Sequence, residues 1–517
     1  MQLILDGRSL ILQDLAPIAR SERLSLALAP AALERVRASR SVVDRHVERG
    51  DVVYGITTGF GKLKNVSIAV ENLGRLQRNL ILSHCCGVGE PMPIAEVRVA
   101  QVLRLNGLMR GHSGVRVEVL QKLVRLFDAE FVPLVPQQGS VGASGDLAPL
   151  AHMTAAYMGV GEAYLRGRRL DAGKGLALLG EEPLELAAKE GLALINGTEI
   201  MKAVGALVLL RTADFSKAAD AILALTIEAL LGSIKPFDDR LADLKNNAGQ
   251  RRTAANVRAC LAGSRVLPSH EGCDRVQDPY SLRCAPQVHG AFKTALAHVW
   301  ELFADEINAV TDNPLVFPDT GEVLSAGLFH GQPVSMVLDY LGLALASMAN
   351  ISERRIEQLV NPDLHKAAKL DQAAHLKPFL APDPGLESGL MIAQVAAAAL
   401  ASENKILAHP ASVDSVPTSA NQEDHVSMGV TAARKARTIL ENCEQVLAIE
   451  LICAAQAREF HHDLSAGRGA EAAHAVLRRY VPALTGDRFL HPDLVRAREL
   501  IASGELVSAV EAATGVL

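Results

Sequence analysis

The sequence contains 517 residues, carries a formal net charge of −6, and is 49% hydrophobic. A mildly acidic chain lacks the basic surface that nucleic-acid binding needs, and no basic region followed by a long apolar run stands at its N-terminus. The seven cysteines form no Cys-x-x-Cys pair and no His-Glu-x-x-His string occurs, so we expect no metal and no disulfide framework. These features predict a cytoplasmic protein that binds neither nucleic acid nor a membrane.

The chain order predicts two domains and a mainly α fold. Residues 1–195 are expected to form a smaller, mixed and loop-rich N-terminal domain, with loops at 55–61, 87–93 and 133–149. Over residues 196–517, apolar side chains recur at three- and four-residue spacing, which predicts an elongated bundle of long helices. The strongest of these helical patterns cover 218–231, 335–360, 391–407 and 432–460.

The stretch Gly142-Ala143-Ser144-Gly145-Asp146 carries the most informative chemistry. Attack of the Gly145 amide nitrogen on the Ala143 carbonyl carbon, with loss of two waters, would produce an electrophilic 4-methylidene-imidazol-5-one ring from Ala143-Ser144-Gly145. Glycine permits the unusual backbone that this closure needs. Taken alone, an Ala-Ser-Gly triplet is more often an ordinary turn or loop-to-helix junction.

Two other motif interpretations are excluded. A nucleophile elbow, Gly-x-Ser-x-Gly, requires glycine where Asp146 stands. A phosphate-binding loop at residues 54–63 requires glycine at Ile56 and a hydroxyl residue at Leu63. We therefore expect no nucleotide cofactor.

An electrophile of this kind needs a base, a cation for a carboxylate and donors for developing charge. Tyr54 precedes a glycine-rich loop, and its phenol would act as a base only in positive or dipolar surroundings. Arg283 offers the planar fork that binds a carboxylate at two points, beside a second phenol at Tyr280. Asn196 and Glu423 lie in polar strings. Each residue alone also fits a structural role as a core tyrosine, salt bridge, cap or turn.

Together, four strings resemble the histidine/phenylalanine ammonia-lyase family, in the same order and over nearly the whole chain. They are Tyr54–Gly61, Gly139–Leu150, Val276–Cys284 and Thr311–Pro314. The resemblance implies a ring formed from residues 143–145, a small amino-acid substrate, and a homotetramer whose active sites are built from more than one subunit. Gln277 and Asn313, inside these strings, are expected to contact the substrate.

The resemblance also implies roles for individual residues. Tyr54 would remove a β-proton after the substrate amine has added to the ring. Arg283 would hold the substrate carboxylate, Asn196 and Tyr280 would contact the ring or the amine, and Phe329 would pack beside the substrate. Helix N-termini are expected to point toward the ring and supply a positive field.

The substrate side chain is predicted by Ser83-His84 and by residues 421–425, which resemble the histidine branch of the family. Phenylalanine and tyrosine enzymes usually carry glutamine at the position of Glu423. A buried carboxylate is a strong acceptor for an imidazole N–H, and a phenyl ring cannot donate to it. His84 and Glu423 are therefore expected to face an imidazole, and L-histidine would give trans-urocanate and ammonia in the first step of histidine degradation.

Three departures from the family pattern keep alternatives open. Glu199 stands where glutamine is usual and would change the charge near the site, and Leu328 stands where asparagine is usual. The segment 365–377 is longer and more basic than expected, and Lys377 replaces a proline. A lyase for a betaine-type modified histidine, or one for tyrosine or phenylalanine, would keep the ring and the base. A non-catalytic helical scaffold would leave the triplet uncyclised.

Overall fold

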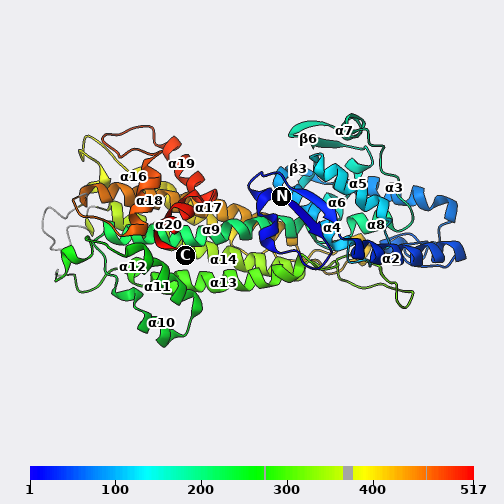
Figure 1. Cartoon of the computed structure of the whole chain (residues 1–517), viewed down its shortest axis with the longest axis horizontal. Helices are drawn as coiled ribbons and strands as arrows, with labels where there is room; N and C mark the ends of the chain where they lie inside the picture. Colours follow the sequence, from blue (N-terminus) through cyan, green and yellow to red (C-terminus); the bar gives the residue numbers. More distant parts are fainter. Residues whose placement is uncertain (273–274, 362, 365–375, 462) are drawn as a thin grey trace. The chain divides into compact units, whose positions relative to one another are not determined.

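The computed structural model describes residues 1–272, 275–361, 363–364, 376–461 and 463–517. Helices account for most of the described chain and strands are few, which confirms the predicted mainly α class (Figure 1). The chain divides into two compact units: unit 1 comprises Met1–Leu207, Trp300–Asp339 and Pro410–Arg434, and unit 2 comprises Val208–Val299, Tyr340–His409 and Lys435–Leu517. Of the segment predicted to depart from the family, residues 365–375 lie outside the described residues.

The strands of unit 1 are only three or four residues long, so they connect helices and do not form a central sheet. β1 (Gln2–Leu5) pairs in parallel with β2 (Ser25–Leu28), and the other pairs are antiparallel. These pairs join β3 (Val88–Pro91) to β5 (Pro136–Gln138), β6 (Glu162–Leu165) to both β4 (Phe131–Pro133) and β7 (Arg168–Asp171), and β8 (Leu315–Phe317) to β9 (Glu322–Leu324).

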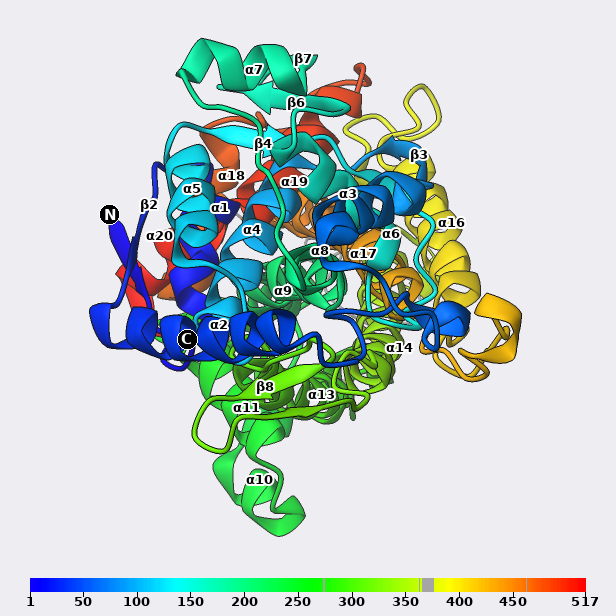
Figure 2. The ribbon, with the colours of Figure 1, turned by 90° about the vertical axis from the view of Figure 1, so that its right-hand side faces the viewer.

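Three helices of unit 1 bring the predicted site residues together. α3 (Leu73–His84), α6 (Leu147–Tyr157) and α8 (Glu190–Ile195) pack against one another (Figure 2). His84 is the last residue of α3, the Ala-Ser-Gly triplet is followed by Asp146 at the N-cap of α6, and Asn196 follows α8. The other α-helices of this unit are α1 (Ala16–Ala19), α2 (Pro30–Arg49), α4 (Ile94–Leu108), α5 (Val117–Asp128) and α7 (Ala172–Leu179).

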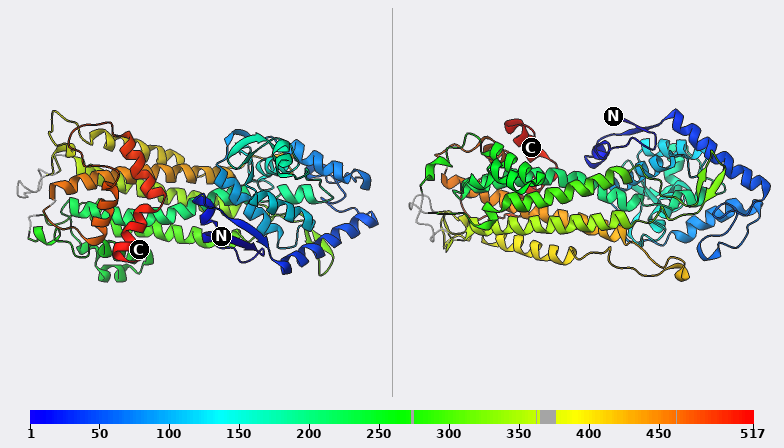
Figure 3. Two further views of the ribbon diagram at one scale, coloured as in Figure 1. Left: turned by 45° about the horizontal axis from the view of Figure 1, so that its top comes forward. Right: turned by 90° about the horizontal axis from the view of Figure 1, so that it is seen from below.

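Long helices supply the core of unit 2. Residues of α9 (Glu199–Ala229), α13 (Ala285–Glu306), α14 (Gln332–Val360) and α17 (Gly429–Arg458) run side by side there (Figures 1 and 3). They are accompanied by α10 (Asp239–Lys245), α11 (Ala248–Leu261), α12 (Tyr280–Arg283), α16 (Met391–Leu407), α18 (Arg468–Arg478), α19 (His491–Ala502) and α20 (Glu505–Thr514). The four predicted helical segments coincide with α-helices, although α9 and α17 each end two residues before the predicted limit, and α16 has the predicted bounds.

α9 extends beyond its strongest apolar pattern. That pattern covered residues 218–231, whereas α9 is continuous from Glu199 to Ala229. Polar residues in its first half, including Glu199, Lys202 and Thr212, are buried. They interrupt the apolar periodicity, which is why the pattern is weaker over these turns. Among the described helices, α14 alone is long and apolar enough to cross a membrane, and 67% of its apolar window is buried, which is typical of a core helix.

A buried polar network links helices within unit 2. The Arg355 guanidinium binds the Glu450 carboxylate at two points, with Nε–Oε1 and Nη2–Oε2 distances of 2.6 and 2.8 Å, and both side chains are fully buried. Burial lowers the pKa of His289. A neutral His289 can donate from Nδ1 to Asp220 at 2.8 Å and accept at Nε2 from Arg355 at 3.3 Å. The network therefore satisfies its buried charges internally.

Glu450→Gln should destabilise the protein. Oε1 of Glu450 accepts from Arg355 and Thr226, and Oε2 accepts from Arg355 and Ser352. An amide would turn its NH2 group toward an N–H donor of Arg355 in either orientation. We expect a loss of about 3 kcal/mol of unfolding free energy and a lower Tm by calorimetry. Glu441→Gln, in a partly exposed pair with Arg211, is the control. Equal Tm changes in the two variants would contradict the prediction.

Candidate active site

A cavity of about 730 Å³ in unit 1 collects most of the predicted site residues. Its lining includes seven of them: Tyr54, His84, Ser144, Asn196, Asn313, Phe329 and Glu423. Ala143 and Gly145 are buried on either side of Ser144. Loops and helix ends that are distant in sequence thus place the triplet, a phenol, an imidazole and a carboxylate around one volume.

The other three predicted residues belong to unit 2 and do not line this cavity. Gln277 is exposed, and Tyr280 retains 69% of its accessible surface. The Arg283 guanidinium carbon stacks 4.3 Å from the centroid of the Tyr280 ring, and its Nε donates to the Asp278 carbonyl at 3.0 Å. The predicted carboxylate-binding cation is therefore absent from the cavity lining in unit 1.

The triplet is held against Gly197 in a backbone conformation that suits glycine. Gly145 has a φ of +74° and forms a parallel bridge with Gly197. A Cβ atom on Gly145 would lie 2.1 Å from the Gly197 carbonyl oxygen, so no side chain fits there. The Asn196 amide Nδ2 donates to the Ser144 carbonyl at 2.9 Å, and the Asp146 backbone N–H donates to Gly197 at 2.7 Å.

Asp146 ties the start of α6 to the start of α9. Its Oδ2 accepts from the backbone N–H groups of Ile200 and Met201, both at 3.0 Å, and its Oδ1 accepts from Ser140 Oγ at 3.1 Å. Burial raises the pKa of Asp146 to about 7. Two helix N-termini, each carrying partial positive charge, consequently meet at the triplet.

The start of α17 is fixed to the same loop. Met428 N–H donates to the Val141 carbonyl at 2.8 Å, and Ser427 Oγ donates to the Gly142 carbonyl at 3.2 Å. α17 begins at the next residue, Gly429. Three helix N-termini are thus attached to residues 141–146, and their dipoles favour negative charge at the triplet.

Glu423 reaches the triplet directly. Its Oε1 accepts a hydrogen bond from Ser144 Oγ at 3.2 Å, and its Oε2 accepts from the hydroxyls of Thr418 and Ser419, both at 2.7 Å. The carboxylate is half-buried. One oxygen is therefore fixed by its own loop, and the other faces the cavity.

The acid–base environment of the cavity differs for its phenol and its imidazole. Burial raises the pKa of Tyr54, the Glu423 charge raises it further, and a hydrogen bond from Gly61 acts in the opposite direction. Burial lowers the pKa of His84, which favours neutral imidazole. The unit's own charges therefore oppose formation of a Tyr54 tyrosinate, which sequence analysis expected to need positive surroundings.

Glu199, Leu328 and Lys377, which belong to the departures from the family pattern, lie outside the cavity lining. Glu199 is buried and paired with Arg104 at 2.8 Å and Lys202 at 3.6 Å, so two cations offset its negative charge. Leu328 is 48% exposed. Lys377 lies in unit 2, where its ammonium donates to the Pro382 carbonyl at 2.5 Å. The expected change of charge at the site is thus compensated locally.

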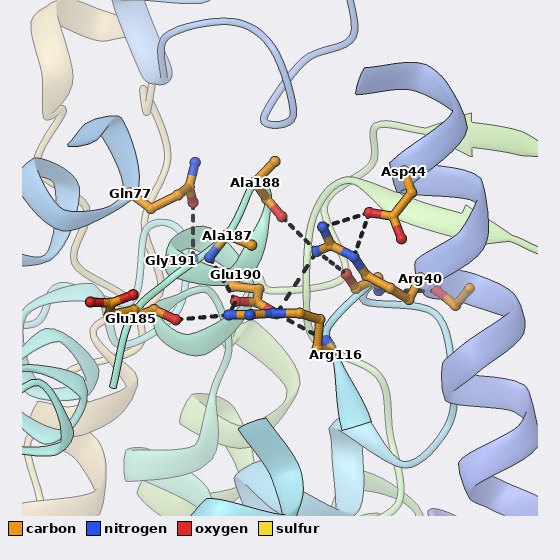
Figure 4. Close-up of polar contacts among 11 residues, drawn as sticks. Arg40, Asp44, Gln77, Arg116, Glu185, Ala187, Ala188, Glu190 and Gly191 are labelled. Atoms are coloured by element: carbon orange, nitrogen blue, oxygen red, sulfur yellow. Dashed lines mark hydrogen bonds and ion pairs between the residues drawn. The ribbon is translucent and has the colours of Figure 1, made fainter. Parts of the chain in front are cut away.

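A cluster of polar contacts anchors the N-terminal end of α8, opposite Asn196 (Figure 4). Glu190 accepts from Arg116 at both carboxylate oxygens, with distances of 2.8 and 2.7 Å. Gly191 N–H donates to Gln77 Oε1 at 2.9 Å, and Arg40 donates to the Ala188 carbonyl at 3.0 Å. A short helix fixed in this way sets the position of Asn196 at its other end.

Sequence reasoning missed several neighbours of the site. Lys64 and Gln422 line the cavity and are joined by a 2.9 Å hydrogen bond. The only sequence signal for them is that they lie within or close to strings that resemble the family. Arg104 is the one cation in the otherwise nearly apolar, fully buried stretch 99–108 of α4, and that isolated charge is a usable signal. Among the described residues, no group of three or more His, Cys, Asp or Glu side chains could hold a metal ion.

Known proteins resemble this chain in sequence and in overall fold. A family model for aromatic amino acid lyases matches residues 10–479. The chain is 52% identical to the histidine ammonia-lyase of Sorangium cellulosum (strain So ce56), over 99% of each chain. The crystal structure of histidine ammonia-lyase from Trypanosoma cruzi has a TM-score of 0.91 and 40% identity, covering 99% of this chain and 96% of the other. Tyrosine aminomutase from Streptomyces globisporus has a TM-score of 0.92 and 34% identity over 100% of both chains.

Glu423→Gln should lower the pKa of Tyr54, because it removes a negative charge that disfavours tyrosinate. Tyrosinate absorbance during an alkaline titration measures this change, and subtracting the titration of a Tyr54→Phe counterpart isolates the signal from Tyr54. Asp424→Asn, which changes the adjacent charge, is the control. A Tyr54 pKa that stays the same or rises in Glu423→Gln would refute the coupling.

Proposed function

Because this chain belongs to the aromatic amino acid lyase family, we propose that it removes ammonia from L-histidine without oxidation and releases trans-urocanate, the first step of histidine degradation. The observation that carries this proposal is the Glu423 carboxylate, whose Oε1 lies 3.2 Å from Ser144 Oγ in the cavity that His84 also lines. Relatives about half identical to the chain and named histidine ammonia-lyase support the same substrate.

The family uses a methylidene-imidazolone group, and the surroundings of Ala143-Ser144-Gly145 fit its formation here. Gly145 has the positive φ and close backbone approach that the closure requires. Asn196 Nδ2 already donates to the Ser144 carbonyl, which would become the ring carbonyl, while Asn196 Oδ1 is buried without a hydrogen-bond partner. When present, the group supplies an electrophilic carbon for the substrate amine.

Glu423 would recognise the imidazole of the substrate. In the open-chain triplet, Ser144 Oγ donates to Glu423 Oε1. Dehydration of Ser144 removes that hydroxyl and leaves Oε1 free to accept an imidazole N–H. Thr418 and Ser419 keep the other oxygen fixed. A phenyl ring has no donor for Oε1 and would leave a partly buried carboxylate unpaired, which disfavours phenylalanine.

Tyr54 would accept the β-proton of the substrate. Because burial and Glu423 raise its pKa, the phenol needs an additional positive field to act as a base near neutrality. The helix N-termini at residues 141–146 contribute to such a field. Arg283 would contribute further positive charge once it binds the substrate carboxylate.

A second copy of the chain would complete the site. Gln277, Tyr280 and Arg283 are not part of the cavity lining, and Tyr280 is exposed. We propose that another subunit of a cytoplasmic homotetramer supplies these three residues. Arg104 and Lys202 offset the charge of buried Glu199, so this departure does not favour a modified histidine over L-histidine.

Ser144→Ala should abolish the electrophilic methylidene group, because alanine has no hydroxyl to lose as the second water. The wild-type peptide that contains residues 143–145 should be lighter than its sequence mass by two water molecules, and the variant peptide should lose at most the one water of ring closure. Deamination of histidine should fall to background. Ser325→Ala, another cavity-lining serine, is the control for ring mass. Wild-type turnover by Ser144→Ala would rule out the proposed chemistry.

Glu423→Gln should lower kcat/KM for L-histidine by about tenfold or more, which corresponds to about 1.4 kcal/mol for a lost charge-assisted hydrogen bond. Urocanate absorbance measures the rate, and peptide mass confirms that the ring has formed. Asp424→Asn, at the exposed neighbouring position, should retain the wild-type value. Identical histidine kinetics in Glu423→Gln and wild type would remove Glu423 from substrate recognition.

A further inference from the structure

A buried ion pair lies directly behind the triplet and is not part of the cavity lining. Arg104 and Glu199 are 2% and 1% exposed. Arg104 Nη1 donates to Glu199 Oε2 at 2.8 Å and to the Asn196 carbonyl at 3.0 Å. Thr311 Oγ1 donates to Glu199 Oε1 at 2.9 Å. One guanidinium nitrogen thus joins the carboxylate to the backbone that precedes Gly197.

Gly197 is sandwiched between this ion pair and the triplet. A Cβ atom on Gly197 would lie 2.3 Å from both Arg104 Nη1 and Glu199 Oε2, so the two charged groups pack onto its Cα. On the other side, the Gly197 carbonyl packs against Gly145, where a Cβ atom would lie 2.1 Å away. The ion pair is therefore separated from Gly145 by a single residue.

A second route runs through Asn196. Arg104 holds the Asn196 carbonyl, and the Asn196 side chain donates to the Ser144 carbonyl at 2.9 Å. The ion pair consequently constrains both the second and the third residue of the triplet. The planar guanidinium suits this task, because it can donate to a carboxylate and a carbonyl in fixed relative directions.

The free-energy cost of burial argues that the pair has a purpose beyond stability. Removing two charges from water is expensive, and well-packed apolar residues of similar volume are often at least as stabilising. Neither Arg104 nor Glu199 lines the cavity, which argues against contact with a substrate. What the pair does contact is the backbone on which the triplet rests.

We propose that Arg104 and Glu199 are positioning residues for ring closure at Ala143-Ser144-Gly145, an inference that rests on the proposed function. Closure forms a bond between the Gly145 nitrogen and the Ala143 carbonyl carbon. The Ala143 oxygen leaves as water with the amide hydrogens of Gly145 and Ser144, which creates a carbon–nitrogen double bond. The Ser144 hydroxyl leaves as a second water with the Ser144 Cα hydrogen. No oxidant or reductant is needed.

Positioning matters because an amide nitrogen is a weak nucleophile and a peptide carbonyl is a weak electrophile. Holding the two in reacting geometry offsets much of the entropic barrier. Gly197 presses on Gly145 from behind, and Asn196 fixes the carbonyl between the two reacting groups. The ion pair keeps both contacts in place.

The test follows ring formation in full-length chains after cell-free synthesis. Peptide mass spectrometry at successive times gives the fraction that has lost two waters, and near-ultraviolet absorbance gives an independent measure. Arg104→Lys keeps the charge but loses the planar fork, and Glu199→Ala removes the partner. Both variants should form the ring about tenfold more slowly than the wild type, as expected for the loss of one or two buried hydrogen bonds.

Two controls separate positioning from charge and from stability. Glu199→Gln can accept from Arg104 through its amide oxygen and donate to Thr311 Oγ1, so it should close at the wild-type rate. Glu450→Gln breaks the pair with Arg355 in unit 2 and should lower Tm without slowing closure. If Glu199→Ala does not fold, the closure rates of Arg104→Lys and Glu199→Gln still test the positioning role.

The outcomes are distinct. Wild-type closure rates in Arg104→Lys and Glu199→Ala would overturn the positioning role, and so would equal slowing in Glu450→Gln. A wild-type chain that never loses two waters would overturn the ring proposal and this inference together. A wild-type chain that forms the ring but does not deaminate histidine would overturn only the proposed substrate.

Discussion

The close approach of Gly145 to Gly197 is the constraint on which the candidate site depends. Neither residue has room for a Cβ atom, since one would lie 2.1 Å from the Gly197 oxygen and the other 2.3 Å from the buried ion pair. This contact joins the start of α6 to the turn that precedes α9. It places Ser144 at the cavity wall, where Glu423, Asn196 and Tyr54 gather around it. A side chain at either glycine would separate the groups that the proposed chemistry needs.

Electrostatics divides the site into two parts. Helix N-termini stand behind the triplet, where electron density would accumulate. Glu423 stands in front and suits an imidazole donor, but it raises the pKa of Tyr54. The carboxylate proposed to select histidine therefore lowers the population of the tyrosinate that is proposed to act as the base. We propose that Arg283 of another copy of the chain supplies the positive charge that offsets this effect of Glu423 on Tyr54. Because Arg283 does not line the cavity of unit 1, the effect is not offset there.

Sequence predicted the parts of the site that lie in short contiguous strings. The triplet, Tyr54, His84 and Glu423 were found because their chemistry is visible within a few residues. Arg104 and Glu199 are 95 positions apart in the sequence. No local sequence pattern predicts a contact between residues that are so far apart. Sequence analysis therefore interpreted Glu199 as a change of charge at the site, whereas Arg104 and Lys202 offset that charge. The mainly α class was predictable from apolar periodicity, but the start of α9 at Glu199 was not, because buried polar residues weaken the period there.

The most direct test of this account is a spectrophotometric assay of the purified wild-type protein with L-histidine, run in parallel with L-tyrosine, L-phenylalanine and a histidine betaine. The account predicts rapid formation of urocanate from L-histidine and little turnover of the other three. Turnover of another substrate with no reaction of L-histidine would contradict the assignment of Glu423 as an acceptor for the imidazole of L-histidine.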